Sequence, residues 1–436
     1  LFIYDIKRFQ KFHSKINFIK ERVTETLGDL YGMHWPYKQH KTSRNQKLLP
    51  YHEELKKAGA CFGVVAGYER PMWFALNKNK PKYEYSYNYQ NWYSSAEYET
   101  TNTRKNIGLF DLTSFAKFEL KGQNAHSELQ RICTANIKNE VGRTTYTQML
   151  NADGGIEADL TVVCLEKEHF RIISSAAVRE RDKHHILKNL DPKIEFKDIT
   201  ENYACLGLFG PKSRSLITEI FGDYFKNGDF PFATAKNINI RNIKVWAQRL
   251  SYVGELGWEL YIPTNDAKKI YKLIIEVGKK YNLCHAGVHA MDILRMEKGY
   301  LHWGHDISPE ENQYEAGLNF TISYKKNVNF IGKDILLKKK GKQLKKKLII
   351  LSLKKSEPGF PLMLHDEPIY SDGKIIGRTT SANYSFNYKK NIAFGYVNPA
   401  HDLKKTKIEI EVEKRKYEAI VEDKPIHDPD NKILKS

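Results

Sequence analysis

One stretch of the chain, TYTQMLNADGGIEADLTVVCLE (Thr145–Glu166), limits the possible folds more than any other. Two runs rich in β-branched and apolar residues flank an Asp-Gly-Gly sequence, which is the pattern of a β-hairpin. The second run carries a carboxylate, Asp159, among residues that favour a buried strand. Because a buried carboxylate is costly without a partner, this hairpin is a candidate for a functional face.

If Asp153-Gly154 forms a two-residue turn, the register of the hairpin follows from it. Gln148 then lies opposite Asp159, and Tyr146 lies opposite Thr161 on the same face. The other face carries the apolar residues Met149, Ile156, Ala158, Leu160 and Val162. A shift of one residue would move Asp159 and Tyr146 to opposite faces, so the prediction depends on the turn.

A second candidate hairpin, LSYVGELGWELYIP (Leu250–Pro263), repeats the arrangement. With Glu255-Leu256 at its tip, Tyr252 faces Glu259 across the two strands. Both hairpins then combine a tyrosine and a carboxylate on one face. The plainer alternative is that these are solvent-facing residues of half-exposed strands.

The hydrophobic periodicity divides the chain into three domains. Residues 1–85 combine a basic amphipathic helix pattern with aromatic, proline-containing loops and form a linking segment. Residues 86–337 alternate between strand and helix patterns. Residues 345–436 show short strands separated by turn signals and no helix, which predicts a small β-barrel or sandwich. The predicted fold class is α+β.

The composition is that of an ordinary soluble protein, with 41% hydrophobic and 28% charged residues. The net charge of +18 comes mainly from scattered lysines, densest at Lys338–Lys347. Without an RNA-binding signature, this run predicts a solvated linker and no nucleic-acid partner, a polyanionic ligand being the minor alternative. Since no membrane span or signal peptide is recognisable, we expect no membrane partner and a cytoplasmic location, or the mitochondrial matrix in a eukaryote.

The cysteines are odd in number and widely spaced within apolar runs, which predicts reduced core residues at Cys61, Cys133, Cys164, Cys205 and Cys284. No CxxC or HExxH spacing occurs, so we predict no structural metal. Neither GxGxxG nor GxxxxGK[ST] is present. Any flavin or nicotinamide would therefore have its main binding domain elsewhere.

From about Ser94 onward the chain resembles the glycine-cleavage T-protein (aminomethyltransferase) family of tetrahydrofolate-dependent enzymes. The matching stretches run in family order and are TRKNIGLFDLTSFAKFELKG, TYTQMLNADGGIEADLTV, CLGLFGPKSR, SYVGELGWELYIP, AMDILRMEKGY, WGHDISPEENQYEAGLNF, NFIGK and GRTTSANYSFNYKKNIAFGYV. The resemblance implies a folate-binding module of α/β subdomains over residues 86–337, followed by a C-terminal β-barrel.

The first 85 residues add a second resemblance. YDIKRF and the stretch from LYGMHWPYK to GYERPMWF are similar to the segment that joins the flavin and folate domains in dimethylglycine and sarcosine dehydrogenases. By this resemblance the chain corresponds to the carboxyl-terminal half of such an enzyme. FAD would then bind only to an amino-terminal domain that is missing here or encoded as a separate subunit.

The T-protein resemblance assigns roles to particular residues. Asp159 would lie beside the reactive folate nitrogens, where a carboxylate can stabilise a cationic iminium and help to move a proton. Tyr146 and Tyr252 would line the pterin pocket, and Glu259 would accept two hydrogen bonds from the pterin. Arg295 is a candidate for the glutamate carboxylate of folate, with a salt bridge inside its own helix as the alternative.

T-proteins carry an arginine earlier in the helix that holds Arg295, and Met291 stands at that place here. The chain thus departs from the family pattern where the folate tail is held. Trp303, His305 and Asp306 could line the same cavity, although a loop tryptophan is more often a core residue.

Three functions fit the sequence. The preferred one is the folate-dependent portion of a dimethylglycine or sarcosine dehydrogenase-like enzyme, which passes a methylene group from an oxidised N-methyl amine to tetrahydrofolate. The second is a stand-alone aminomethyltransferase or a folate-dependent demethylase or methyltransferase, acting on a sulfonium or a lipoyl-bound aminomethyl group without flavin. The third is a folate-binding protein without catalysis, and the retained Asp159 argues against it.

Overall fold

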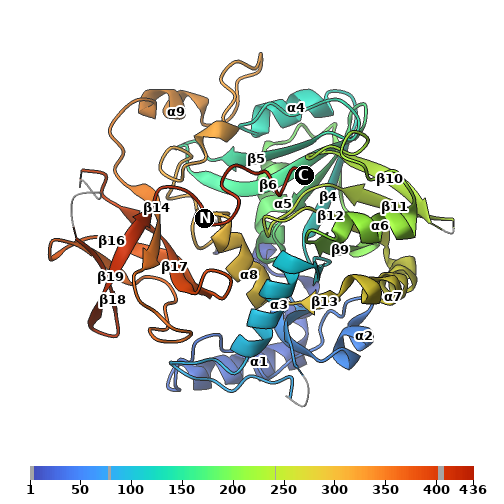
Figure 1. The fold of residues 1–436 in the computed structure, drawn as a ribbon. Coiled ribbons are helices and arrows are strands. Elements are labelled where there is room, and N and C mark those ends of the chain that lie inside the picture. Colours follow the sequence, from blue (N-terminus) through green and yellow to red (C-terminus); the bar gives the residue numbers. More distant parts are fainter. Residues whose placement is uncertain (1–3, 77–79, 241, 401–406) are drawn as a thin grey trace.

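The computed structural model describes residues 4–76, 80–240, 242–400 and 407–436. Two larger β-sheets lie beside a closed β-barrel, and helix α8 (Val288–Glu297) lies between them (Figure 1). This helix contacts strands of the barrel and of the amino-terminal segment. No helix in the described part of the chain is long and apolar enough to cross a membrane.

The amino-terminal segment, blue in Figure 1, contains two α-helices, long loops and a two-stranded antiparallel sheet. Its elements are α1 (Ile16–Asp29), α2 (His52–Lys57), β1 (Ala60–Val65) and β2 (Tyr68–Phe74). Glu69 of β2 is buried and pairs with Arg44, and it also accepts a hydrogen bond from the Asn45 amide. These bonds attach the loop that follows α1 to the small sheet.

The first large sheet has five strands in the order β5-β6-β7-β4-β8. Its strands are β4 (Ala116–Lys121), β5 (Thr144–Leu150), β6 (Ile156–Glu166), β7 (His169–Ser174) and β8 (Glu195–Asp198), and its helices are α4 (Ala125–Ile132) and α5 (Arg179–Asn189). Alternate residues of β6, among them Leu160 and Val162, pack into one core with residues of both helices. The other face of β6 is left for Asp159 and Thr161.

The second large sheet has six strands in the order β10-β11-β12-β9-β3-β13. Its strands are β3 (Ile107–Asp111), β9 (Tyr203–Phe209), β10 (Ala235–Ile240), β11 (Ile243–Gln248), β12 (Gly257–Pro263) and β13 (Leu283–Ala286), and its helices are α6 (Ser213–Phe221) and α7 (Ala267–Gly278). Trp258, Leu260 and Ile262 of β12 share a core with these helices. Glu259 and Tyr261 face the opposite way.

The barrel closes in the order β14-β17-β16-β15-β18-β19. Its strands are β14 (Lys347–Leu353), β15 (Pro368–Ser371), β16 (Lys374–Ser385), β17 (Lys390–Val397), β18 (Ile408–Val412) and β19 (Arg415–Glu422). Closure pairs every barrel strand on both sides, which removes exposed sheet edges. The predictions of an α+β chain and a carboxyl-terminal barrel are confirmed.

Two further helices connect these parts, α3 (Tyr93–Lys105) and α9 (Lys333–Lys339). The lysine-rich run begins in α9 and ends at the first barrel strand, so only its middle is a loop. Single turns of 3-10 helix occur at Ile6–Arg8, Lys11–Ser14, Ala176–Val178, Thr200–Asn202, Thr264–Asp266, Lys279–Tyr281 and Asn319–Thr321. All five cysteines are buried and free, as predicted.

The predicted register of the first hairpin is confirmed, although its turn is longer than predicted. Gln148 pairs with Asp159 and Tyr146 with Thr161, but a bulge at Glu157 near the start of β6 brings Leu150 opposite Ile156. The Asn151 side chain closes the connection by accepting hydrogen bonds from the amides of residues 153 and 155. The bulge compensates for the longer turn, so the register of the site residues is unchanged.

The predicted register of the second hairpin is wrong. Glu259 pairs with Gln248, and Tyr252 lies in the loop between β11 and β12 instead of on a strand. The ladder ends where Arg249 turns into the protein, because its buried guanidinium donates to the Phe230 and Ser436 carbonyls at 2.7 and 2.6 Å. Residues 255–256 belong to this longer loop and do not form the predicted tight turn.

Gly155, at the end of the first hairpin turn, provides a test of this packing. A Cβ at this position would lie 1.9 Å from the Pro309 carbonyl oxygen, which is backbone and cannot rotate away. We expect Gly155→Ala to lower the free energy of unfolding by about 2–4 kcal/mol in urea denaturation. Gly228→Ala is the control, since nothing lies within 4 Å of its Cβ. Equal stability of the two variants would contradict this packing.

Candidate functional site

A cavity of about 1780 Å³ lies where the two large sheets, α8, the barrel and the amino-terminal segment meet. The faces of β6 and β12 that point away from α4–α7 contribute to its wall. The structure brings all five residues expected at the site to this one cavity: Tyr146, Asp159, Tyr252, Glu259 and Arg295. They come from widely separated parts of the sequence, so only the folded chain assembles the group.

Asp159 is held by a neighbour that sequence reasoning left out of the site. The Gln148 amide donates to Asp159 Oδ1 at 2.8 Å, while the Gln148 carbonyl accepts from Thr321 and Gln313. These bonds fix the orientation of the amide, so that its N–H group points to the carboxylate. The register predicted from the sequence already placed Gln148 opposite Asp159.

Burial raises the pKa of Asp159 to about 6, against the lowering effect of hydrogen bonds from Gln148 and Tyr146. Tyr146 lies two residues before Gln148 on β5, and 39% of its surface is accessible although it lines the cavity. Burial and the Asp159 charge raise the pKa of the Tyr146 phenol well above its ordinary value. A carboxylate that titrates near neutrality can both accept and release a proton under physiological conditions.

Glu259 and Gln248 lie side by side on paired strands and both line the cavity. Burial raises the pKa of Glu259, and Tyr261 donates to its Oε2 at 2.7 Å. The Gln248 side chain is fully buried, and neither its oxygen nor its nitrogen has a hydrogen-bond partner among the described residues. An unpaired buried amide beside a carboxylate has the capacity to bind a planar, polar ring. Sequence reasoning missed Gln248 because the second hairpin was assigned the wrong register.

Tyr252 reaches the cavity from its loop. Its hydroxyl donates to the Leu301 carbonyl at 2.8 Å, and its ring lies nearly parallel to that of Tyr300, with centroids 6.2 Å apart. Burial is the main cause that raises the pKa of Tyr252. Its hydroxyl is engaged by the protein, so its ring is the part that a ligand would contact.

Arg295 is 1% exposed and its guanidinium is already paired inside the protein. It bonds Asp306 at 2.6 Å, Asp292 at 2.8 Å and Ser381 of the barrel at 2.8 Å. Burial lowers the pKa of Arg295, but the two carboxylates outweigh burial and leave that pKa raised. To hold the carboxylate of a folate tail, as expected from the sequence, Arg295 would have to give up one of these bonds.

The WGHD stretch, left out of the predicted site, also reaches the cavity. Trp303 and His305 line it, and the Trp303 indole donates to the Ile156 carbonyl at 3.1 Å. Asp306 is fully buried and is the partner of Arg295. Trp303 therefore connects this loop to the start of the strand that carries Asp159.

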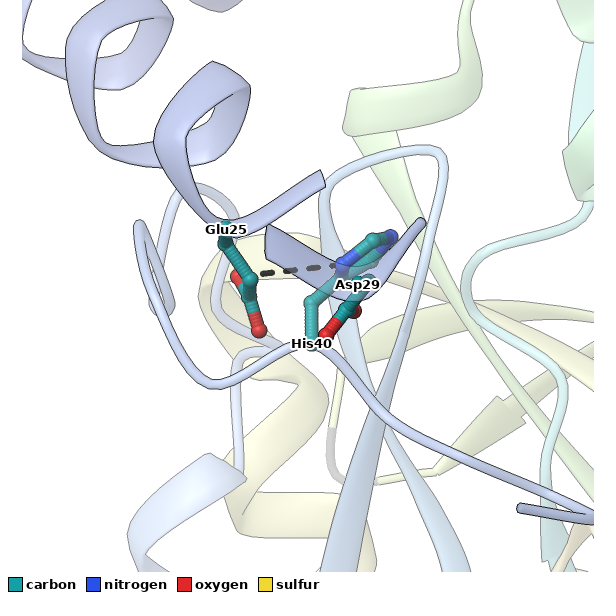
Figure 2. Close-up of side chains that lie close together, drawn as sticks. All are labelled: Glu25, Asp29 and His40. Atoms are coloured by element: carbon teal, nitrogen blue, oxygen red, sulfur yellow. Dashed lines mark ion pairs between the residues drawn. The ribbon is translucent and has the colours of Figure 1, made fainter. Parts of the chain in front are cut away.

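Outside the cavity, one group of described side chains has the donor atoms to hold a metal ion: Glu25, Asp29 and His40 (Figure 2). The Glu25 carboxylate already accepts hydrogen bonds from the Lys41 and Thr42 amides and from the Thr42 hydroxyl. Asp29 is paired with Lys38 at 2.6 Å. These bonds attach the end of α1 to the following loop, and they account for the cluster without an ion.

Models of known families match almost the whole chain. The GCVT N-terminal domain model matches residues 51–326, and the glycine cleavage T-protein C-terminal barrel domain matches residues 346–428. The FAD dependent oxidoreductase central domain matches residues 1–48. These matches follow the order of the amino-terminal segment, the two sheets and the barrel.

Two longer relatives are similar in sequence to almost the whole of this chain. 4-Methylaminobutanoate oxidase (formaldehyde-forming) of Paenarthrobacter nicotinovorans is 35% identical over 99% of this chain and 52% of its own length. Mitochondrial sarcosine dehydrogenase of Homo sapiens is 31% identical over 91% of this chain and 47% of its own length. The chain thus spans about half the length of these relatives.

The fold is that of a solved structure, the glycine cleavage system aminomethyltransferase T from Bartonella henselae. The match has a TM-score of 0.76 at 22% identity and covers 88% of this chain and 99% of that one. At this identity the match establishes the fold alone.

The raised pKa of Asp159 has a consequence for stability. A folded-state pKa of about 6, above the ordinary 3.8, means that the contribution of Asp159 to stability falls as pH rises from about 4 to 6. Asp159→Asn keeps the acceptor for Gln148 and removes the buried charge. We expect it to raise the free energy of unfolding by on the order of 1–2 kcal/mol at pH 8, with little change at pH 4.

Urea denaturation at both pH values would measure this difference. Asp153→Asn is the matched control, because Asp153 lies in the exposed turn of the same hairpin. A variant at position 159 that is less stable than the parent at pH 8 would contradict the assigned burial of the charge.

Proposed function

Since the chain belongs to the glycine cleavage T-protein family, we propose that it transfers a one-carbon unit to tetrahydrofolate. In this proposal it is the carboxyl-terminal portion of a dimethylglycine or sarcosine dehydrogenase-like enzyme. The observation that carries the proposal is the meeting of Asp159 and Glu259 at one cavity, each on the face of its sheet opposite the core that packs under the flanking helices. Neither carboxylate has a cationic protein partner within 4.0 Å among the described residues.

The residues present fit tetrahydrofolate. Its pterin ring carries several N–H donors and a carbonyl acceptor on one edge, and Glu259 with the unpaired Gln248 amide offers the complementary groups. Tyr252 and Tyr146 offer aromatic surface in the same cavity. When bound, tetrahydrofolate supplies the nitrogens that accept the one-carbon unit.

The proposed transfer balances without a net change in protons. A cationic iminium donor gives up its methylene carbon, and the two hydrogens displaced from the accepting nitrogens end on the departing amine, which leaves as its ammonium form. Asp159 has the properties that this step requires. Its carboxylate can stabilise the cationic donor, accept a proton at a carboxylate oxygen and return it to the amine nitrogen. With a pKa of about 6 it is mostly ionised at pH 7.

The amino-terminal segment supports a flavin-linked donor over a free-standing aminomethyltransferase. Residues 1–48 match a domain of FAD dependent oxidoreductases, and His34, Trp35, Pro36 and Tyr37 of this segment form part of the cavity wall. We propose that the imine is made by a flavin-binding domain or subunit and enters this cavity. FAD itself would bind to that domain or subunit and not to the residues described here.

A second outcome follows from the name of one relative, which is formaldehyde-forming. Water added to the same iminium gives formaldehyde and the amine, and this happens wherever folate does not capture the carbon. The proposed enzyme therefore has two competing products. Their ratio would report how well the site holds tetrahydrofolate.

Calorimetric titration of tetrahydrofolate into the purified chain tests the pocket. We expect saturable binding that is weakened about 10- to 100-fold by Glu259→Ala, since two hydrogen bonds to a charged group are lost. Gln248→Leu should also weaken binding, while Asp159→Asn should still bind. Glu97→Ala, on the exposed face of α3, is the control. A folded wild-type chain that binds no tetrahydrofolate would contradict the pocket assignment.

The catalytic role of Asp159 is tested by turnover. N-(hydroxymethyl)sarcosine, formed from ¹³C-formaldehyde and excess sarcosine, is offered with tetrahydrofolate, and methylene transfer is followed by NMR with the uncatalysed rate subtracted. We expect the wild-type rate to rise between pH 5 and 7 as Asp159 ionises, and Asp159→Asn to lose about 10²- to 10⁴-fold. An unchanged rate in the variant would remove Asp159 from the mechanism.

A further inference from the structure

Arg70 of β2 is a cation of the cavity wall that the proposed function does not use. Its neighbour on the same strand, Glu69, points to Arg44, whereas Arg70 itself lines the cavity with Met72. In the structure it faces the same cavity as Asp159 and Glu259.

Arg70 is unusual in having no protein partner. Within the described residues its guanidinium makes no hydrogen bond and no ion pair, and its Nε is buried and unpaired. By contrast, other cations in the interior of this wall are engaged, Arg295 by Asp292 and Asp306 and Lys298 by Asp428. A desolvated guanidinium without a counter-ion is a strong binder of carboxylates, for which its planar fork is the matching shape.

No neighbouring side chain in the described part of the chain occupies the Arg70 guanidinium as an ion-pair partner, so it is available to a ligand carboxylate. The Phe115 ring lies on one side, with its centroid 5.8 Å from the guanidinium carbon, and Phe115 lines the cavity too. Asp111 is the carboxylate whose charge acts on Arg70, but it lies beyond ion-pairing distance. Its Oδ1 accepts from the Tyr51 hydroxyl and the Thr113 amide, both at 2.9 Å. Burial lowers the pKa of Arg70, and Asp111 only partly offsets that effect.

Arg70 lines the same cavity as the groups proposed to act on folate. Phe115 and Tyr252 pack against the same core cluster, which also contains Val163 of β6 and Tyr261 of β12. Arg70 comes from the amino-terminal side of the cavity, where His34, Trp35 and Tyr87 also lie. This is the side from which a donor made outside these residues would enter under the proposed function.

We propose that Arg70 binds the carboxylate of the one-carbon donor. This inference rests on the proposed function, since it assigns a binding residue to the N-methyl amino acid, or its imine, that would enter that same cavity. The glutamate tail of folate is the other carboxylate that could reach the cavity, and the experiment separates the two.

The test is a binding measurement on the purified chain saturated with tetrahydrofolate. Sarcosine is titrated and its binding followed by saturation-transfer NMR, with sarcosinamide as the probe that lacks the carboxylate. We expect Arg70→Gln to weaken sarcosine binding at least tenfold and to leave sarcosinamide binding unchanged. Arg70→Lys, which keeps the charge without the fork, should show an intermediate loss. Arg415→Gln, an exposed arginine of the barrel, is the matched control.

Tetrahydrofolate and a tetrahydropterin without a glutamate tail are titrated into the same variants. Unchanged affinity for both in Arg70→Gln is expected. A loss of affinity for tetrahydrofolate alone would show that Arg70 binds the glutamate tail of folate, and this would overturn the proposal. If wild type binds tetrahydrofolate but not sarcosine, or Arg70→Gln binds sarcosine normally, the inference fails while the proposed function stands. Failure to bind tetrahydrofolate at all would instead reject the proposed function.

Thermal unfolding separates a binding role from a structural one. Because Arg70 has no hydrogen-bond or ion-pair partner among the described residues, Arg70→Gln should keep or raise the melting temperature. A lower melting temperature for this variant, with sarcosine binding unchanged, would assign Arg70 to a structural contact with Asp111.

Discussion

The buried charges of α8 are the interaction on which the rest of the molecule depends. Arg295 joins this helix to Asp306 in the following loop and to Ser381 in the barrel. Two residues later Glu297 accepts hydrogen bonds from Arg104 of α3 and from Ser385 of the barrel. Each ion would be costly to bury alone, so the parts that carry the partners must dock together. This network fixes the barrel against the sheets and closes one side of the cavity.

Alternate residues of the strands in the two sheets face either a hydrophobic core or the cavity. Their alternation sends Leu160 and Leu260 into cores beneath helices, and it sends Asp159 and Glu259 into the cavity between the sheets. The cores therefore stabilise the strands without involving the polar residues. The cavity residues remain under-satisfied, as the unpaired Gln248 amide and the raised pKa values of both carboxylates indicate. Such groups lower stability and are typical of a binding site.

Local patterns in the sequence were enough to predict an all-β carboxyl-terminal domain, the first hairpin and the strand face of Asp159, while the choice of a barrel came from the family resemblance. Those features depend on strand periodicity and turn residues, which act over a few positions. The second hairpin failed because Arg249 leaves the ladder for partners at residues 230 and 436, far away in the sequence. For Arg295 the alternative of a salt bridge inside its own helix is confirmed by Asp292, whereas its bonds to Asp306 and to a serine of the barrel were not predicted. Among the described residues, Arg295 is paired with distant groups and Arg70 is not. This difference depends on tertiary contacts, which a local sequence pattern does not predict.

The cavity wall is built from chain segments that lie far apart, from His34 in the amino-terminal segment to Leu434 near the end of the described residues. A ligand in this cavity would touch several parts of the chain at once. It would thereby act as a thermodynamic link between domains, adding about 2.7 kcal/mol to stability at a hundredfold excess over its Kd. Supply of the ligand would then set how much of the protein is folded as well as how fast it works.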